Sequence, residues 1–238
     1  MIGITECGDA GLDFSWVNQV PITDFSILIT KNLNNKFIDE VLKVKHKVIV
    51  HATITGMGGS IIEPNVPKME WSINQLKKLI DSGFPASQVV LRVDPIIPTE
   101  SGINLATRVI NAASGLGISR CRISVLDVYP HVQARFRQAG MEIQPYNLSD
   151  AYAAIVKALE PYKNIWEFEA CAENVPFRLG CISQKDADIL KSKVVLMGNK
   201  GQRRGCLCPR NKSELLSHKS QCPHGCLYCY WSKDYTNE

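Results

Sequence analysis

Three cysteines, Cys222, Cys226 and Cys229, have the spacing of a metal-binding loop. They form a C-x3-C-x2-C pattern, with Gly225 in the tight part of the loop and Tyr228 just before the third cysteine. Thiolates that converge on one point favour a soft metal. Three ligands on one loop suit a [4Fe-4S] cluster, because one iron of the cube then stays open for chemistry. A structural zinc site would need a fourth protein ligand.

The stretch 222–231, with the sequence CPHGCLYCYW, resembles the cluster motif of radical S-adenosylmethionine (SAM) enzymes. Within that superfamily it is most similar to the spore photoproduct lyase and photolyase-like branch. The resemblance implies that the amino and carboxylate groups of SAM chelate the open iron. The motif normally lies near the N-terminus, after the first barrel strand. Its late position here resembles a circular permutation, as in an uncharacterised bacterial family that carries the same C-terminal motif.

A second, independent resemblance lies in the middle of the chain. Residues 63–67 (EPNVP) and 91–98 (LRVDPIIP) are similar to a core segment of the photolyase-like radical SAM group. Residues 30–32 (TKN) are similar to the T-K-S sequence of that group, whose lysine lies near the SAM carboxylate. Residues 5–9 match its T-x-T-D strand end more loosely. With the cysteine motif, the resemblance extends over roughly residues 1–130 and 200–232.

The resemblance implies six cofactor-binding residues: Asp9, Lys31, Thr53, Arg92, Asp94 and Tyr228. Lys31 or Arg92 would pair with the SAM carboxylate. Thr53 or Asp9 would hold the amine or the ribose, and Tyr228 would pack near the adenine. Arg92 and Asp94 also have a structural alternative, in which they form an ion pair inside the barrel mouth.

Four further cysteines, Cys171, Cys181, Cys206 and Cys208, are left over near this motif. An auxiliary [4Fe-4S] cluster is one interpretation, because the uncharacterised permuted family looks similar at all four places. A structural zinc at the same sulfurs and free buried thiols remain as alternatives. Of the nine cysteines, Cys121 is expected in the core and Cys7 as a bystander at a strand end.

Composition places the chain among ordinary globular proteins. It has 238 residues, 45% hydrophobic and 21% charged, which is enough for one domain with a sizeable core. A net charge of +4 permits an anionic partner and does not require one. We find no export signal and no apolar run of about eighteen residues, so we expect no membrane partner and a cytoplasmic location. The clustered cysteines then indicate metal ligation rather than a disulfide framework.

The segment before the cysteine motif is basic. Its positive residues are Lys200, Arg203, Arg204, Arg210, Lys212 and Lys219. They could follow a phosphate backbone, which would fit a nucleic-acid substrate, and a solvated loop explains them equally well. His218 and His224 could be ligands, but surface positions are expected first, with His224 lining the cluster loop as the alternative.

Alternating apolar runs and helical patterns must position these residues. Strands are predicted at residues 1–5, 25–30, 48–53, 89–94, 121–127 and 165–170. Helices are predicted at residues 35–42, 69–82 and 104–114, with another that Ser149 caps. Repeated strand and helix indicate a parallel α/β sheet, whose carboxyl-end loops form the active face.

These elements predict a partial (β/α)6 barrel of the TIM type, in the circularly permuted radical SAM arrangement. Residues 1–198 would form the barrel, and residues 199–238 would form a cluster-binding segment packed on its mouth within a single compact domain. Residues 194–197 either add an edge strand or lead into the cysteine segment.

The resemblance implies an enzyme that reductively cleaves SAM at a [4Fe-4S] cluster. The resulting 5′-deoxyadenosyl radical would abstract hydrogen from a substrate, with a modified or damaged nucleobase, in DNA or as a nucleoside, expected first. A small metabolite or a peptide is the alternative substrate. The sequence does not decide whether the reaction is that of a lyase, an isomerase or an oxidoreductase. A reductant such as flavodoxin or ferredoxin would supply the electron. The alternative function is a non-catalytic zinc-binding module for nucleic acid or a protein partner.

Overall fold

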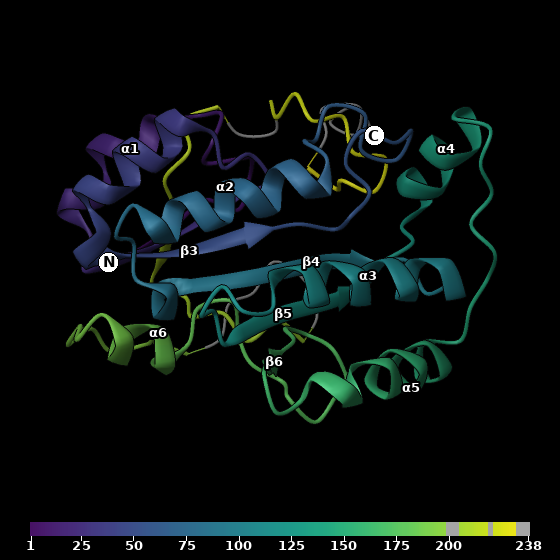
Figure 1. Cartoon of the computed structure of the whole chain (residues 1–238). Coiled ribbons are helices and arrows are strands. Elements are labelled where there is room, and N and C mark those ends of the chain that lie inside the picture. The colour runs from purple at the N-terminus through teal and green to yellow at the C-terminus, as the bar shows by residue number, and fades with distance from the viewer. Residues whose placement is uncertain (199–204, 219–220, 232–238) are drawn as a thin grey trace.

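A computed structural model describes residues 1–198, 205–218 and 221–231. Its centre is a seven-stranded sheet in which all paired strands are parallel (Figure 1), in the order β6-β5-β4-β3-β2-β1-β7. The strands are β1 (Ile2–Ile4), β2 (Phe25–Thr30), β3 (Val48–Thr53), β4 (Val89–Ile96), β5 (Arg120–Val125), β6 (Glu167–Glu169) and β7 (Lys212–Glu214). The end strands β6 and β7 do not pair with each other in the described part of the chain, so the sheet is open.

Six α-helices accompany the sheet. They are α1 (Asn35–Lys43), α2 (Met69–Asp81), α3 (Glu100–Ala113), α4 (Pro130–Gln138), α5 (Leu148–Leu159) and α6 (Gln184–Ile189) in the described residues, together with short 3-10 turns. Side chains of Asn34, Thr99 and Asn147 accept hydrogen bonds at the starts of α1, α3 and α5. The cap of α5 is therefore Asn147, and the prediction of Ser149 in that role is wrong.

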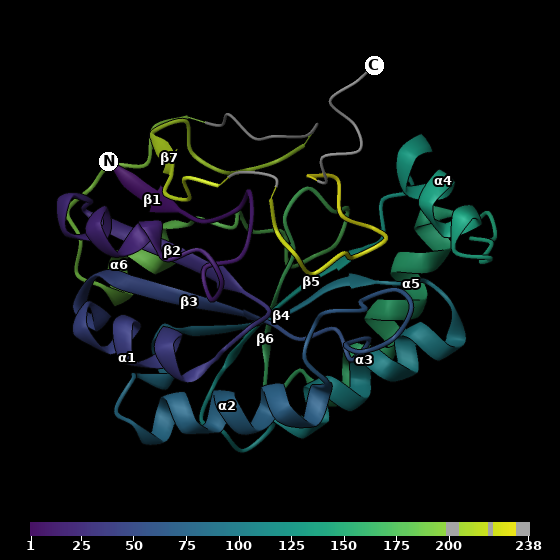
Figure 2. The same cartoon turned by 90° about the horizontal axis from the view of Figure 1, so that it is seen from above.

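Side chains alternate between the two faces of the strands. On the outer face, residues such as Val50, Leu91 and Ile123 join a large apolar cluster with the helices α1, α2, α3 and α5. Figure 2 shows α1, α2 and α3 along this side of the sheet, with β7 and the last described segment on the opposite side. A strand covered on both faces has few polar positions, which explains why the strands read as apolar runs.

The inner face is divided in two. Near β1 and β2 it is apolar, and α6 with the segment after it packs against residues such as Ile4 and Phe25. Near β5 and β6 it is charged: the buried Arg120 contacts Glu169 at 2.7 Å and Asp186 of α6 at 2.8 Å. Buried charges are tolerated only when they are paired in this way. Helix α6 therefore closes one end of the inner face and leaves the carboxyl ends of the strands open.

The α/β class and the parallel sheet are confirmed. The sheet has seven strands, one more than predicted, and the additional strand is the short polar Lys212–Glu214 at the edge. Residues 194–197 form no strand, so that alternative is wrong. None of the helices in the described residues is long and apolar enough to cross a membrane.

Candidate functional site

A cavity of about 920 Å³ opens at the carboxyl ends of the strands. This is a size typical of small-molecule and cofactor sites. Every candidate site residue from the sequence lines it: Asp9, Lys31, Thr53, Arg92, Asp94, Tyr228, Cys171, Cys181, Cys206, Cys208, Cys222, Cys226 and Cys229. Loops after parallel strands meet at the same edge of a sheet, which is why positions so distant in sequence share one space.

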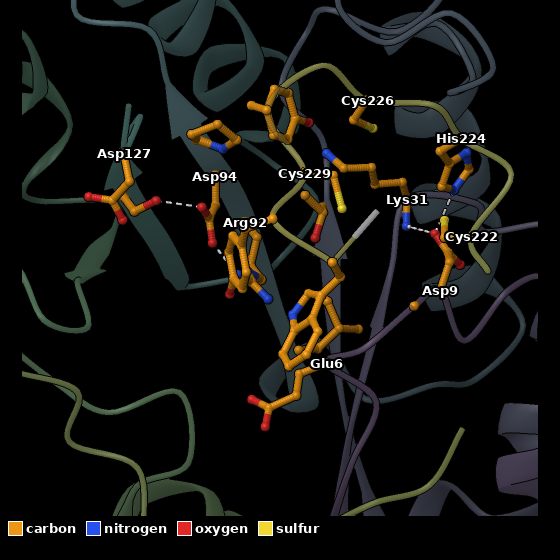
Figure 3. Close-up of a pocket in the computed structure, with 18 of the residues that line it drawn as sticks. Glu6, Asp9, Lys31, Arg92, Asp94, Asp127, Cys222, His224, Cys226 and Cys229 are labelled. Carbon is orange, nitrogen blue, oxygen red and sulfur yellow. Dashed lines mark hydrogen bonds and ion pairs between the residues drawn. The ribbon is translucent and has the colours of Figure 1, made fainter. Parts of the chain in front are cut away.

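Cys222, Cys226 and Cys229 lie on one loop at this cavity (Figure 3), here named the triad loop, residues 222–229. Its backbone is fastened to the segment after β3: the Asn65 side chain donates to the Pro223 carbonyl at 2.8 Å, and the Leu227 amide donates to the Ile62 carbonyl at 3.0 Å. Gly225 adopts a left-handed conformation, with φ of 67°, that favours glycine.

Helix α4 holds the other side of the triad loop. The Arg135 guanidinium donates to the carbonyl of Cys226 at 3.1 Å and also to that of Cys229. Leu227 packs with Val132 and Phe136 of the same helix. Contacts from two directions therefore hold the backbone of the triad loop in place.

His224, between the first two cysteines, is buried, with 3% of its surface exposed, so the expected surface position is wrong. Its Nε2 lies 2.7 Å from an Asp9 carboxylate oxygen, and its Nδ1 lies 3.1 Å from the Asn65 carbonyl oxygen. Both partners are acceptors, so both ring nitrogens donate and the imidazole is positively charged. Burial opposes this charge, but the hydrogen bond and charge of Asp9 raise the pKa of His224 above its usual value.

Asp9 holds together the ends of β1 and β2 as well as the triad loop. Its carboxylate accepts hydrogen bonds from the Gly11 amide, the Thr30 hydroxyl and the Lys31 amide, besides His224. Burial would raise the pKa of Asp9, but His224 and these donors lower it overall. The carboxylate thus has a positioning role, and its contact with SAM stays a prediction.

Lys31 lies beside the triad loop with a buried counter-ion. Its Nζ is 2.9 Å from Glu63, and it stands 5.4 Å from the ring centre of Tyr228. Glu63 also accepts hydrogen bonds from Thr55 at 2.6 Å and from the Tyr228 hydroxyl. Burial would lower the pKa of Lys31, but Glu63 and then Cys226 raise it, so the ammonium stays charged. Glu63 and His224 are buried beside the triad loop, and the sequence analysis assigned a cofactor-binding role to neither of them.

Arg92 and Asp94 form the ion pair that the sequence left as an alternative. Asp94 also accepts a hydrogen bond from Ser124 of β5. The Nε of Arg92 itself and the hydroxyl of Thr53 are buried and have no hydrogen-bond partner within the described residues. Because an unpaired buried polar atom is costly, these atoms are available to a bound ligand.

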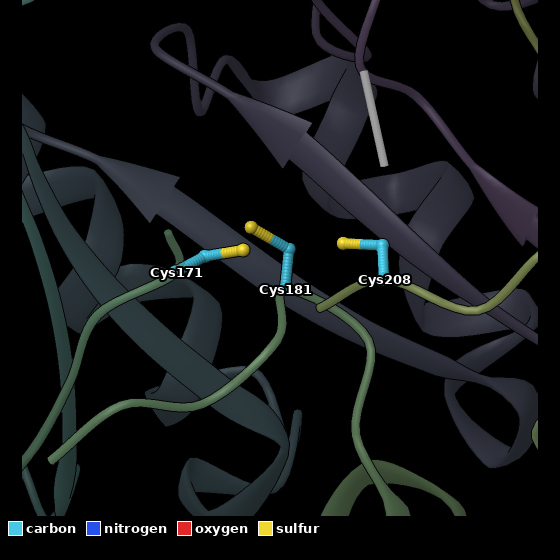
Figure 4. Close-up of side chains that lie close together, drawn as sticks. All are labelled: Cys171, Cys181 and Cys208. Carbon is cyan, nitrogen blue, oxygen red and sulfur yellow. The ribbon is translucent and has the colours of Figure 1, made fainter. Parts of the chain in front are cut away.

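The other four cysteines come from two segments at the same cavity, and are named the second cysteine group. Cys171 and Cys181 follow β6, whereas Cys206 and Cys208 precede β7. The sulfur atoms of Cys171, Cys181 and Cys208 all lie within 4.8 Å of one another (Figure 4). The sulfur of Cys206 lies 3.7 Å from that of Cys171.

Comparison with known proteins places the chain in a family. Residues 17–231 match the family described as Domain of unknown function (DUF1848). The chain belongs to the DUF1848 family. The matched region of this DUF1848 chain contains all seven candidate metal ligands. No curated protein and no solved structure matches the chain.

The remaining candidates of the DUF1848 chain have structural roles or lie elsewhere. Cys121 is buried in β5, as expected, and burial raises the pKa of its thiol. His218 is exposed beside Asp13, also as expected. Lys212 pairs with Glu6 at 2.6 Å, so its charge is already balanced. Among the other basic residues, Arg210 is exposed, and Lys200, Arg203, Arg204 and Lys219 lie outside the described residues.

Proposed function

We propose that this protein is a radical SAM enzyme. Cys222, Cys226 and Cys229 would hold a [4Fe-4S] cluster at the mouth of the open parallel sheet, and SAM would bind in the cavity beneath it. The observation that carries the proposal is the arrangement of the triad loop, whose three thiols line the same cavity as the cations of Lys31 and Arg92. Under this proposal the open sheet is a partial TIM-like barrel whose segments occur in circularly permuted order.

The surroundings of the triad loop favour a cluster over zinc. A structural zinc needs a fourth protein ligand, and His224 is the residue on the loop that could supply it. Both ring nitrogens of His224 are already used, one on Asp9 and one on Asn65. Three thiolates without a histidine suit a cube with one open iron. Burial raises the pKa of Cys222 to about 12 and that of Cys226 to about 11, so these sulfurs need metal charge to stay ionised.

The chain's own residues would bind and orient SAM. Arg92 offers a donor without a partner at Nε, and Thr53 offers a hydroxyl, so both can bind polar groups of a ligand without breaking an existing hydrogen bond. Lys31 keeps its charge beside the triad loop, where a SAM carboxylate would be attracted to it. When bound, the cluster and SAM would supply a 5′-deoxyadenosyl radical, and the protein would exclude water and hold the substrate.

Aromatic side chains at the rim support a nucleobase as the substrate. Tyr230 is half exposed and contacts Tyr129 at 6.4 Å between ring centres, and Trp231 at 5.6 Å. Exposed aromatic rings of this kind can stack on bases. A modified or damaged nucleobase therefore remains the first substrate class, with flavodoxin or ferredoxin as reductant. The cytoplasm, where thiols stay reduced, suits such a cluster.

The test is to purify the full chain anaerobically, count iron and sulfide, and incubate the reduced protein with SAM. We expect 5′-deoxyadenosine in wild type, none in Cys226→Ala, and an unchanged yield in the control Cys121→Ala. Turnover that survives in Cys226→Ala would exclude the triad loop from the reaction. A colourless protein with zinc at the triad loop and no sulfide would instead support the non-catalytic zinc-binding module.

A further inference from the structure

We propose that the second cysteine group binds one zinc ion with four sulfur ligands, rather than a second iron–sulfur cube, and that this ion joins the two open edges of the sheet. The proposal rests on the spacing of the sulfurs and on where their segments lie. It does not depend on the radical SAM function, because it concerns different cysteines.

Three of the four sulfur atoms lie close enough together to bind a single ion, and the fourth lies next to one of them. Zinc–sulfur bonds of about 2.3 Å in a tetrahedron place neighbouring sulfurs about 3.8 Å apart. The 3.7 Å between the sulfurs of Cys171 and Cys206 agrees with this distance. The sulfurs of Cys171, Cys181 and Cys208 all lie within 4.8 Å of one another. In a cube each thiolate binds a different iron, so its sulfurs are pushed well beyond the spacing around one ion.

The comparison with the triad loop sharpens this argument. Among the described residues, Cys171, Cys181 and Cys208 are the one set of three or more histidine, cysteine or acidic side chains whose ligand atoms gather so closely. The cysteines of the triad loop do not meet that condition, although they line the same cavity. The sulfur atoms are therefore more widely spaced in the triad loop than in the set of Cys171, Cys181 and Cys208.

Cys206 supplies the fourth ligand. It is partly exposed, whereas Cys171 and Cys208 are buried, and its thiol interacts with both of them. Its sulfur lies 3.7 Å from that of Cys171 but does not belong to the set of three sulfurs that are all within 4.8 Å of one another. A rotation of this partly exposed side chain would complete a site that the buried cysteines already define.

The site lies between the two edges of the sheet. Cys171 and Cys181 are carried by the segment after β6, and Cys206 and Cys208 by the segment before β7. Strands β6 and β7 are the first and last in the sheet order, and no pairing between them occurs in residues 1–198, 205–218 and 221–231. A metal held by both segments would connect these edges where backbone hydrogen bonds do not.

The two segments already approach each other closely. The Arg178 side chain donates to the Gly205 carbonyl at 2.7 Å. A Cβ added at Gly180 would lie 3.0 Å from the Leu207 carbonyl oxygen, so glycine is needed where the backbones pass. Arg122 of β5 donates to the carbonyls of Leu179 at 3.0 Å and Gly180 at 2.9 Å, directly before Cys181. The ligands therefore sit on a supported backbone, as metal sites require.

The experiment counts metal and sulfide in the full chain, produced with zinc and iron both supplied. It compares wild type with Cys181→Ser, with Cys226→Ala, and with the control Cys121→Ala. We expect one zinc per wild-type chain, lost in Cys181→Ser with iron and sulfide unchanged, and retained in Cys226→Ala. Iron and sulfide lost from Cys181→Ser would indicate a second cube and overturn the proposal. So would a wild-type chain without zinc.

X-ray absorption at the zinc edge keeps the proposal testable if Cys181→Ser does not fold. In wild-type protein we expect four sulfur neighbours at about 2.3 Å and no nitrogen or oxygen neighbour. Nitrogen or oxygen in the first shell would show that the ion is not held by four sulfurs and would overturn the assignment.

Discussion

The two groups of cysteines line one cavity but are built in opposite ways. The triad loop carries three sulfurs on one short segment, and the imidazole of its histidine is hydrogen-bonded to Asp9 and Asn65. The second cysteine group takes its four sulfurs from two segments that are distant in sequence; three of these sulfurs lie within 4.8 Å of one another, and the fourth lies 3.7 Å from the sulfur of Cys171. Ligand number and spacing, rather than the presence of cysteine, separate a site with an open position from a closed one. We infer that the first group serves chemistry and the second serves architecture.

Removing zinc from the second cysteine group should have the largest effect on stability. Zinc binding that is coupled to folding contributes on the order of 10 kcal/mol in small domains. We expect a strong zinc chelator to lower the melting temperature of wild type far more than any single substitution below, measured by thermal unfolding with the iron content followed in parallel. The chelator should leave Cys181→Ser unaffected, and an equal drop in that variant would show that the chelator acts elsewhere.

The next largest effect is expected from Lys31→Met. This change leaves the fully buried Glu63 without its counter-ion, and breaking a buried pair from one side costs about 3 to 5 kcal/mol. Denaturant unfolding measures the loss. The double variant Lys31→Met with Glu63→Gln should recover part of it, whereas zinc content should stay at the wild-type level in both proteins.

His224→Gln separates an anchoring role from ligation. The substitution removes a charged hydrogen bond to Asp9, which is worth about 1.5 to 3 kcal/mol. We expect reduced stability with iron and sulfide still bound, as measured by unfolding and metal analysis on the same preparation. Complete loss of iron, with zinc retained, would instead make His224 a ligand and weaken the contrast between the two groups.

The smallest effect is expected from Thr53→Val, which removes a hydroxyl without a partner and keeps the side-chain shape. Stability should be unchanged or slightly higher. SAM affinity should fall by up to about tenfold, which corresponds to one hydrogen bond of 0.5 to 1.5 kcal/mol. Equilibrium binding of SAM measures the change, and unchanged affinity would remove Thr53 from the binding site.

The sequence predicted the interior of the fold better than its edges. The bounds of β2 and β3 agree residue for residue with the predicted runs, because central parallel strands are apolar on both faces. The edge strand β7 consists of Lys, Ser and Glu, so no pattern marked it, and only its pairing with β1 makes it a strand. The sequence analysis also missed α4 and α6, because these helices are short and have only two buried residues each.

In the candidate site, too, some positions were predictable from the local sequence and others were not. Strand-end positions were predictable, because the carboxyl ends of parallel strands must meet, and Lys31, Thr53 and Arg92 do line one cavity. The burial of His224 was not predictable from its loop, since Asp9, the partner that keeps it buried, is 215 residues away. The tight spacing of the second cysteine group likewise depends on how the sheet edges approach each other.

Strand β7 pairs with β1, so the last strand of the sheet is the spatial neighbour of the first in sequence. A chain that began with the β7 segment and then continued into β1 would deliver the triad loop to the same mouth. A genetic rearrangement could therefore change the order of these segments in the sequence while each side chain kept its position in the fold.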